Sequence, residues 1–413
     1  MEAREYAWMI LNKTVTDDAF TGNLLRKKRN DMKEDDWNLA VRIIYGTLSN
    51  RLYLRYQWEE FKRGKLSSKL MNLIDMSVYQ LVFLDRIPDY AVIDEAVNLA
   101  KSEQPSMAPV VNGILRSFAR RGKKELSGSS REVLSLRTSV PSWLAGLWIS
   151  QYGEETAVKL CEDTLTVKPT AFRVRKGFDP EEILKTNPGF RKGKIAENSL
   201  VAEGKIPGEV FGRNSLAVQD QSSQCVVKEL DVRPGMKVLD MCAAPGTKTI
   251  QIAEYLEGSG EVHAYDVYPA RVRLIKESVK KYGFGNVVKA KAYDARVLHE
   301  CEEKESFDRV LLDAPCSGLG VLKDKPDMKY RVQGKDLDDC AALQKELLKS
   351  AYGMLKDGGI LVYSTCTLNK KENERQVSSF LKEYPSMTLI NERTYFPFED
   401  ENDGFYHAVL KKG

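Results

Sequence analysis

The apolar residues in the first part of the chain recur every three or four positions. This spacing places them on one face of an amphipathic helix. Four stretches show it, at residues 40–48, 73–82, 93–100 and 110–118. Because no alternating strand pattern interrupts them, we expect residues 1–127 to form an all-α domain.

The pattern changes after this region. Residues 127–130 read Ser-Gly-Ser-Ser, the composition of a linker, and Pro141 precedes an apolar helical face that contains Trp143 and Trp148. Short strand-like pieces broken by Gly and Pro follow. We therefore expect a small α/β linker domain at 140–213, with both tryptophans in its core.

One strand-like piece, residues 171–175, alternates Arg173 and Arg175 with apolar residues. One face of such a strand is basic, because side chains alternate between the two faces. A basic face suits a nucleic-acid groove, and an edge strand with salt bridges has the same pattern. The sequence leaves both interpretations open.

Strands and helices alternate from about residue 214 to the end of the chain. The expected strands are 237–240, 261–265, 287–292, 310–312 and 360–363, and helical patterns lie at 271–281 and 343–355. Alternation of this kind predicts a mostly buried parallel sheet with helices on both faces. We expect this α/β domain to span residues 214–413.

Composition narrows the class of protein. The 413 residues are 42% hydrophobic and 30% charged, and no apolar run approaches the roughly 20 residues of a membrane span. The N-terminus lacks the basic-then-apolar order of a signal peptide. The seven cysteines include no C-x-x-C pair, and there are only three histidines. We expect a cytoplasmic protein with free thiols, without a metal site and without a membrane partner.

The net charge of +4 is mild, but the basic residues are clustered. Four groups precede residue 200: 26–29, Arg116 with 120–124, 173–176 and 191–194. A single group of this kind is typical of solvated surface. Four groups in a chain of nearly neutral total charge favour a polyanionic partner.

A carboxylate and a thiol follow the expected strand 310–312. Asp313 comes first, and Pro315 then forces a turn immediately before Cys316. In an open α/β sheet, ligands bind at the carboxyl ends of the strands. The segment 307–318 therefore places both groups at a candidate site.

A small-residue turn follows the strand at 237–240. Its residues are Cys242, Ala243, Ala244, Pro245, Gly246, Thr247 and Lys248. It is neither the three-glycine dinucleotide fingerprint nor a P-loop. Asp266 ends the next strand, where a carboxylate can accept both hydroxyls of a ribose. Asp294 follows the third strand and could hold an adenine amino group. Together with Asp313, these acids indicate an adenosyl ligand without phosphates.

A second thiol, Cys366, follows the expected strand 360–363. That strand should lie beside the one that ends at Asp313, so Cys316 and Cys366 would face one crevice. A lone cysteine is usually a small buried apolar residue. Two cysteines at equivalent strand ends, each beside hydroxyl residues, favour a chemical role.

Several motifs resemble those of the RNA (cytosine-5) methyltransferases. Three carry the likeness: Asp-Ala-Pro-Cys-Ser-Gly at 313–318, Ser-Thr-Cys-Thr at 364–367 and Cys-Ala-Ala-Pro-Gly-x-Lys-Thr at 242–249. Further similar segments lie at 111–116, 218–223, 325–331 and 403–406. The whole chain resembles the Sun/Fmu (RsmB) branch. Thr247 replaces a frequent glycine of the family, and Lys325 and Tyr330 replace a frequent His and Trp.

The resemblance implies a NusB-like RNA-binding domain at 1–127 and a small RNA-binding linker domain at 140–213. It also implies a Rossmann-like catalytic domain at 214–413 that uses S-adenosyl-L-methionine. It implies methylation of C5 of one cytosine in 16S ribosomal RNA by a monomer, through a covalent bond to C6. Cys366 would be the nucleophile and Cys316 would assist product release. Asp313 would contact N3 of the base, and Lys248 would orient the base. The cofactor would contact residues 242–248, Asp266, Asp294 and Asp313.

Three other functions would also fit parts of this sequence. The first is methylation of another RNA such as tRNA, and the second is a non-catalytic RNA-binding regulatory protein. The intact Cys316, Cys366, Asp313 and Asp266 argue against the regulatory protein. The third, an amino-group or small-molecule methyltransferase, is disfavoured by Pro315-Cys316, because amino methyltransferases usually carry two prolines and an aromatic there.

Overall fold

The computed structural model describes residues 2–16, 21–25, 32–204, 206 and 208–413. The predicted basic group at 26–29 lies outside these residues. The chain divides into two compact units. A helical unit contains Met1–Thr166 and Leu322–Arg331, and an α/β unit contains Val167–Val321 and Val332–Gly413.

The helical unit confirms the predicted all-α region. Its helices are α1 (Ala3–Thr16), α2 (Thr21–Leu24), α3 (Glu34–Ser49), α4 (Arg51–Trp58), η1 (Glu59–Phe61), α5 (Ser68–Phe83), α6 (Asp89–Glu103), η2 (Pro105–Met107), α7 (Ala108–Arg121), α8 (Ser130–Thr138), α9 (Ser142–Tyr152), α10 (Glu154–Asp163) and α15 (Met328–Arg331). The predicted apolar series fill one core; in α3, for example, Ala40, Ile43, Ile44 and Leu48 are buried.

Residues 127–130 lie in the connection between α7 and α8, and they also form the start of α8. Ser129 caps α8 in a capping box with Glu132, which satisfies donors at the helix start. The apolar face of α9 buries Trp148 to 1% exposure but leaves Trp143 at 40%. Because α9 and α10 belong to the helical unit, the expected middle segment 140–213 is divided between the two units after Thr166.

The segment Leu322–Arg331 is held inside the helical unit by hydrogen bonds to main-chain carbonyls. Lys329 Nζ donates to the oxygens of Ser49 and Thr138, each at 3.2 Å. The Tyr330 hydroxyl donates to the oxygens of Leu48 and Ser139, at 2.8 and 3.2 Å. Burial lowers the pKa of Lys329 to about 7.

A small antiparallel sheet opens the α/β unit, with strand order β2-β3-β1-β4. Its elements are β1 (Ala171–Val174), α11 (Pro180–Thr186), β2 (Phe190–Lys192), β3 (Ser199–Ala202), η3 (Gly208–Gly212) and β4 (Leu216–Val218). Strand β1 lies inside this sheet, so the edge position in the salt-bridge interpretation is wrong. Its salt bridges are present, because Arg173 and Arg175 both pair with Glu254, and the burial of both arginines leaves no basic face here for a nucleic-acid groove.

The main sheet has seven strands in the order β10-β11-β9-β8-β5-β6-β7. Its elements are α12 (Gln221–Glu229), β5 (Lys237–Asp240), α13 (Thr247–Tyr255), β6 (Glu261–Asp266), α14 (Pro269–Tyr282), β7 (Val288–Ala292), η4 (Ala295–Glu300), β8 (Phe307–Asp313), α16 (Gly334–Met354), β9 (Leu355–Thr365), α17 (Glu374–Glu383), β10 (Met387–Tyr395), α18 (Pro397–Asp400) and β11 (Phe405–Lys412). Strands β5 to β9 are parallel, as predicted, whereas β10 and β11 add an antiparallel edge.

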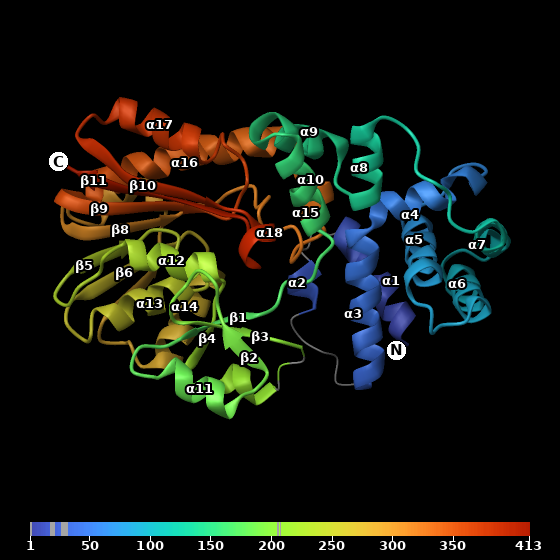
Figure 1. The fold of residues 1–413 in the computed structure, drawn as a ribbon, viewed down its shortest axis with the longest axis horizontal. Helices are drawn as coiled ribbons and strands as arrows, with labels where there is room; N and C mark the ends of the chain where they lie inside the picture. Colours follow the sequence, from blue (N-terminus) through green and yellow to red (C-terminus); the bar gives the residue numbers. More distant parts are fainter. Residues whose placement is uncertain (1, 17–20, 26–31, 205, 207) are drawn as a thin grey trace. The chain divides into compact units, whose positions relative to one another are not determined.

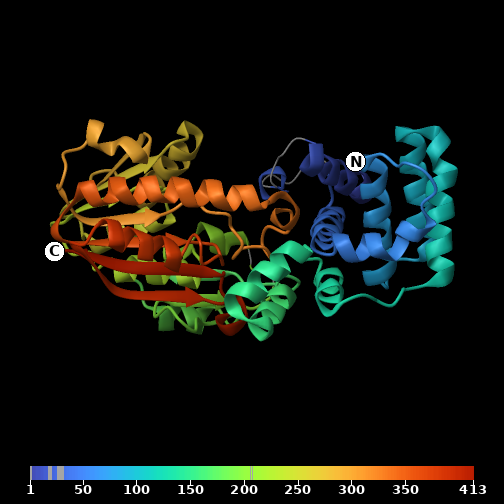
Figure 2. The ribbon, with the colours of Figure 1, turned by 90° about the horizontal axis from the view of Figure 1, so that it is seen from above.

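Helices cover both faces of this sheet, which confirms the predicted three-layer α/β arrangement. Figure 1 shows α16 and α17 on one side and α12, α13 and α14 on the other, and Figure 2 shows α16 lying along the strands. Each face has its own apolar core, one centred on residues such as Leu312 and Leu348, the other on Val238 and Ile275. The carboxyl ends of β5, β6 and β8 therefore meet at one edge.

Candidate active site

The two predicted cysteines lie together. Strands β8 and β9 are parallel neighbours in which Asp313 pairs with Ser364, so the turns that follow them lie side by side. Cys316 Sγ is 3.4 Å from Cys366 Sγ, and both side chains are partly exposed. The contact with Cys366 and burial raise the pKa of Cys316 well above its usual value. The turns after β8 and β9 thus hold a pair of interacting thiols.

Hydrogen bonds join the two cysteine turns to each other. The hydroxyls of Ser317 and Thr367 are 2.7 Å apart, and the Leu319 amide donates to Thr367 Oγ1 at 3.2 Å. The Gly320 amide donates to the carbonyl of Cys366 at 3.0 Å. A Cβ on Gly320 would lie 1.9 Å from the carbonyl oxygen of Gly404. The turns are therefore closely fitted, and only a residue without a side chain fits there.

Asp313 and Lys248 form an ion pair at the same edge of the sheet. Lys248 Nζ donates to Asp313 Oδ2 at 2.7 Å, and Ser364 Oγ donates to Asp313 Oδ1 at 2.8 Å. Burial alone would lower the pKa of Lys248, but the attraction of Asp313 outweighs it and the pKa is raised. The amine is therefore a cation, and the carboxylate keeps both oxygens engaged.

The small-residue turn leads from β5 into α13. Gly246 adopts φ +106°, and a Cβ there would lie 3.2 Å from Ile275 Cα, so the chain bends where only glycine fits comfortably. Below the turn, Asp240 accepts a hydrogen bond from Thr249 Oγ1 at 2.7 Å. Burial raises the pKa of Asp240 to about 7, and its Oδ1 has no partner among the described residues. The predicted residues Cys242, Ala243, Ala244, Pro245 and Thr247 all lie on this turn or at its exit.

The two predicted adenosine-binding acids differ in their surroundings. Asp266 ends β6, is buried, and accepts from the Tyr268 amide at 3.1 Å; its Oδ2 lies 3.3 Å from Arg271 Nη1. Asp294 follows β7 and caps η4. Both oxygens of Asp294 accept from the Arg296 side chain. Asp266 stands at the same edge as the turn, whereas a ligand at Asp294 would share that carboxylate with an arginine.

The sequence analysis missed Glu372, which supports the Cys316 turn. Its side chain is fully buried and accepts from Ser317, both from the amide at 2.9 Å and from Oγ at 2.5 Å. Asn369 Nδ2 and Gln344 Nε2 donate to it at 2.9 and 3.1 Å. Glu372 lies in a polar run with no strand-end position, so the only available signal was a charged residue six positions after Cys366.

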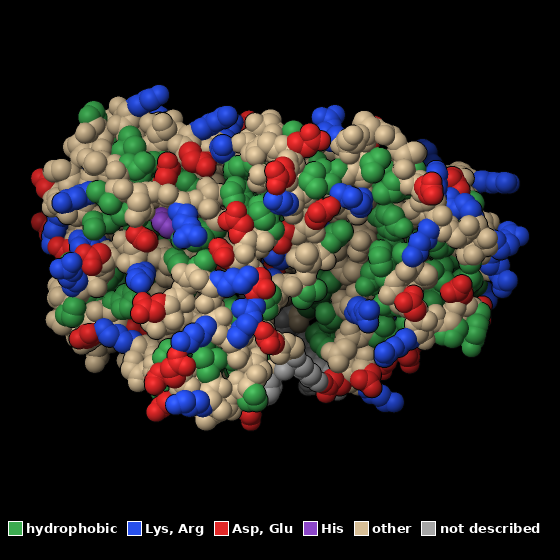
Figure 3. Space-filling model, in the orientation of Figure 1, with side chains coloured by type: hydrophobic (Ala, Val, Ile, Leu, Met, Phe, Trp, Pro, Cys, Tyr) green, Lys and Arg blue, Asp and Glu red, His purple; other side chains and the backbone are tan. Residues whose placement is uncertain are grey.

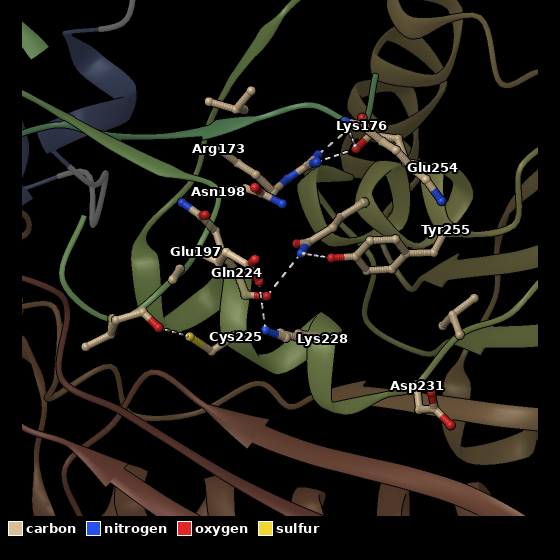
Figure 4. A pocket seen from close by; sticks show the side chains of 15 residues that line it. Arg173, Lys176, Glu197, Asn198, Gln224, Cys225, Lys228, Asp231, Glu254 and Tyr255 are labelled. Carbon is tan, nitrogen blue, oxygen red and sulfur yellow. Dashed lines mark hydrogen bonds and ion pairs between the residues drawn. The ribbon is translucent and has the colours of Figure 1, made fainter. Parts of the chain in front are cut away.

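Most described residues of the predicted basic groups are already paired with acids. Arg121 and Lys124 contact Glu60. The groups 173–176 and 191–194 form salt bridges with Glu254, Glu257, Glu203, Glu181 and Glu401. Figure 4 shows Arg173 directed at Glu254. Both side chains line a cavity whose volume is about 390 Å³. Figure 3 shows basic and acidic side chains interspersed over one face.

One pair of arginines is different. Arg116 and Arg120, near the end of α7, line a cavity of about 500 Å³ together with the exposed ring of Tyr90. Within the described part of the chain neither arginine forms a salt bridge; Arg116 Nε donates to Asn112 Oδ1 at 2.9 Å. Two cations beside an exposed aromatic ring are the combination that nucleic-acid surfaces use.

Among the described residues, no group of three or more His, Cys, Asp and Glu side chains is arranged to hold a metal ion. None of the described helices has the length and apolarity that a membrane crossing requires.

Known proteins resemble this chain in both of its parts. Residues 227–411 match the family model described as 16S rRNA methyltransferase RsmB/F, and residues 1–120 match the NusB family. The crystal structure of PH0851 has the same fold, with TM-score 0.85 at 23% identity over 100% of this chain and 99% of that one. A methyltransferase homolog protein from Pyrococcus horikoshii gives 0.61 at 26% identity, over 70% and 100% of the two chains. Fold and site together define a methyltransferase.

A curated relative narrows this class to one family. The probable ribosomal RNA small subunit methyltransferase B of Bacillus subtilis (strain 168) is 37% identical over 396 residues, which cover 92% of this chain and 88% of that protein. The chain belongs to the ribosomal RNA small subunit methyltransferase B family.

Proposed function

We propose that this protein transfers a methyl group from S-adenosyl-L-methionine to C5 of a cytosine in 16S ribosomal RNA, through a covalent bond between Cys366 and C6. The observation that carries the proposal is the 3.4 Å contact between two thiols beside the Lys248–Asp313 ion pair. Cytosine-5 chemistry needs a nucleophile, an acid near N3 and a group that assists release. The family membership supports the ribosomal substrate.

The proposed chemistry begins at Cys366. Its thiolate adds to C6, and the electron pair of the C5–C6 double bond makes C5 nucleophilic. A hydrogen bond to N3 from the ion pair of Asp313 and Lys248 favours this addition. S-adenosyl-L-methionine, when bound, supplies the methyl group that C5 receives. The C5 proton then passes to water, and the C6–S bond breaks with its electron pair returning to Cys366. Cys316 assists this last step by hydrogen bonding to the departing sulfur.

The residues present fit an adenosyl cofactor without phosphates. Asp266 offers a buried carboxylate at the end of β6, one strand away from the small-residue turn. The turn itself carries no side chain at Gly246, and the start of α13 leaves main-chain amides free to donate. Residues 242–248 and Asp266 would hold the adenosine and methionine portions, and Asp294 would hold the adenine amino group while sharing its carboxylate with Arg296.

A covalent trap tests the proposal on the full chain. With 16S RNA containing 5-fluorocytidine and S-adenosyl-L-methionine, the wild type should form a protein–RNA band on a denaturing gel. Cys366→Ala should form none. With unmodified RNA, Cys316→Ala should accumulate the adduct that the wild type resolves, because release lacks its assistant.

Other outcomes separate the remaining possibilities. A band only with tRNA would move the substrate to another RNA. RNA binding without methyl transfer in the wild type would support a regulatory protein. A stable adduct in Cys366→Ala but not in Cys316→Ala would exchange the two cysteine roles.

A further inference from the structure

We propose that Glu372 is a positioning residue whose buried negative charge keeps the proton on Cys316, so that Cys366 is the cysteine that ionises and attacks. This inference rests on the proposed function, because it explains how two adjacent thiols come to differ. The chemistry of the thiol group alone would allow either cysteine to attack.

The geometry places the charge of Glu372 directly under one of the two turns. The side chain is fully buried, and both its oxygens accept hydrogen bonds from Ser317, the residue next to Cys316. Gln344 and Asn369 donate to the same carboxylate. Four donors compensate this carboxylate for the water that burial removes. Its field acts on Cys316 at short range and without screening by water.

The Cys366 side of the pair has the opposite surroundings. Lys248, a buried cation, lies so close to Cys366 that this cysteine contributes to the raised pKa of Lys248. A thiolate is favoured beside a cation and disfavoured beside an anion. Glu372 adds to the rise in the pKa of Cys316 that Cys366 and burial produce. The titratable and charged groups around the two thiols are Lys248, Asp313, Glu372, Cys340 and Tyr363.

The ion pair between Lys248 and Asp313 does not remove the difference in charge around the two thiols. Asp313 accepts from Lys248 and from Ser364, so its charge is shared by two donors at the β8 strand end. Among the described residues, the four groups that donate to Glu372 are neutral amides and a hydroxyl, and none is a cation. One negative charge is therefore left on the Cys316 side. When Cys366 is ionised, the protonated Cys316 can donate across the 3.4 Å contact and stabilise it.

Thiol alkylation measures this difference without RNA or methyl donor. The full-length protein is treated with limiting iodoacetamide at a series of pH values, and modification at each cysteine is read by peptide mass mapping. In the wild type Cys366 should react ahead of Cys316, and its reaction should begin at a lower pH. In Glu372→Gln the ratio of the two rates should fall about tenfold, the effect of roughly one pKa unit. Exposed Cys301 serves as the internal reference.

Two matched variants separate charge from packing. Glu374→Gln removes a carboxylate two positions away, which accepts from Thr394 Oγ1 and not from Ser317, and should keep the wild-type ratio. Ser317→Ala removes one hydrogen bond to Glu372 but leaves its charge, so Cys366 should still react first. Glu372→Asp keeps a carboxylate at this position, so Cys366 should still react ahead of Cys316, with a rate ratio close to that of the wild type.

The inference is overturned if folded Glu372→Gln keeps the wild-type ratio, or if Cys316 reacts first in the wild type. Should Glu372→Gln fail to fold, the wild-type pH profile still decides, because a lower onset for Cys316 than for Cys366 contradicts the proposal. Alkylation needs no substrate. A failed covalent trap with a confirmed alkylation order would therefore reject the proposed function and not this inference.

Discussion

At the residue scale, the site combines groups that the sequence could place with groups that it could not. Cys316 and Cys366 could be brought together in advance, because each follows a strand and the two strands are neighbours. Glu372 could not, since its contact with Ser317 depends on how a loop folds back beneath the turn. The burial of Asp240 could not be predicted either. An acid at a strand end that is buried against Thr249 has the same sequence pattern as an acid that faces a ligand.

Asp266→Ala tests the cofactor position. Removing a buried carboxylate that can accept both ribose hydroxyls should weaken S-adenosyl-L-methionine binding by one to two orders of magnitude, about 1.4–3 kcal/mol. Titration calorimetry measures this affinity, and RNA binding should barely change. Asp294→Ala is the comparison, with a smaller effect expected because Arg296 already occupies that carboxylate. An unchanged cofactor affinity in Asp266→Ala would remove this residue from the site.

Gly320→Ala tests the fit between the cysteine turns. The new Cβ would meet the carbonyl oxygens of Gly404 at 1.9 Å and of Cys366 at 2.9 Å, both main-chain atoms that cannot turn aside. We expect the free energy of unfolding to fall by about 1–3 kcal/mol. Adduct formation should also slow, because the main chain at Cys366 must shift.

Chemical denaturation and the covalent trap are the two measurements for Gly320→Ala. Gly353→Ala in α16 is the control, since a Cβ there meets nothing within 4 Å. It should leave stability unchanged or raise it by up to about 1 kcal/mol. Equal stability of both variants would show that the turns tolerate displacement.

At the element scale, the strands that alternate with helices were predictable and the two that do not were missed. The five predicted strands correspond to β5–β9, because buried parallel strands carry short apolar runs between helical patterns. Strand β11 is apolar and buried, but it follows β10 without a helix of ordinary length between them. Strand β10 lies at the sheet edge and exposes charged residues such as Glu392, so it lacks an apolar run altogether.

The segment Leu322–Arg331 supports a pH prediction. Lys329 has a pKa of about 7 in the folded protein, below that of an unfolded lysine. Between these values the unfolded chain binds more protons, so the free energy of unfolding should rise with pH above 7, by up to about 1.4 kcal/mol per pH unit. In Lys329→Met this contribution should vanish. The difference between the two denaturation profiles isolates it, and parallel profiles from pH 7 to about 9 would contradict the assignment.

At the scale of the whole molecule, the basic clusters in the sequence predict a larger surface for attracting RNA than the structure offers. Arg173, Arg175 and Arg191 lie in two of the predicted basic groups, yet each forms a salt bridge with a glutamate far away in sequence. Such pairing depends on the tertiary fold and leaves no local signal. Among the described residues of the predicted basic groups, Arg116, Arg120 and Lys123 form no salt bridge, and the two arginines line one surface with Tyr90.

The Tyr90–Arg116–Arg120 surface supports the last prediction. If both arginines contact phosphates, Arg116→Gln with Arg120→Gln should make the slope of log affinity against log salt shallower by about 1.4–1.8. Tyr90→Ala should weaken binding by about 1–3 kcal/mol without changing that slope, because stacking releases no counterions. Arg137→Gln is the control, since Arg137 already contacts Glu162 at 2.7 Å. Filter binding to 16S RNA fragments at several salt concentrations gives all four slopes. A slope equal to that of the wild type in the double variant would mean that this arginine pair is solvated surface and that RNA contacts the protein elsewhere.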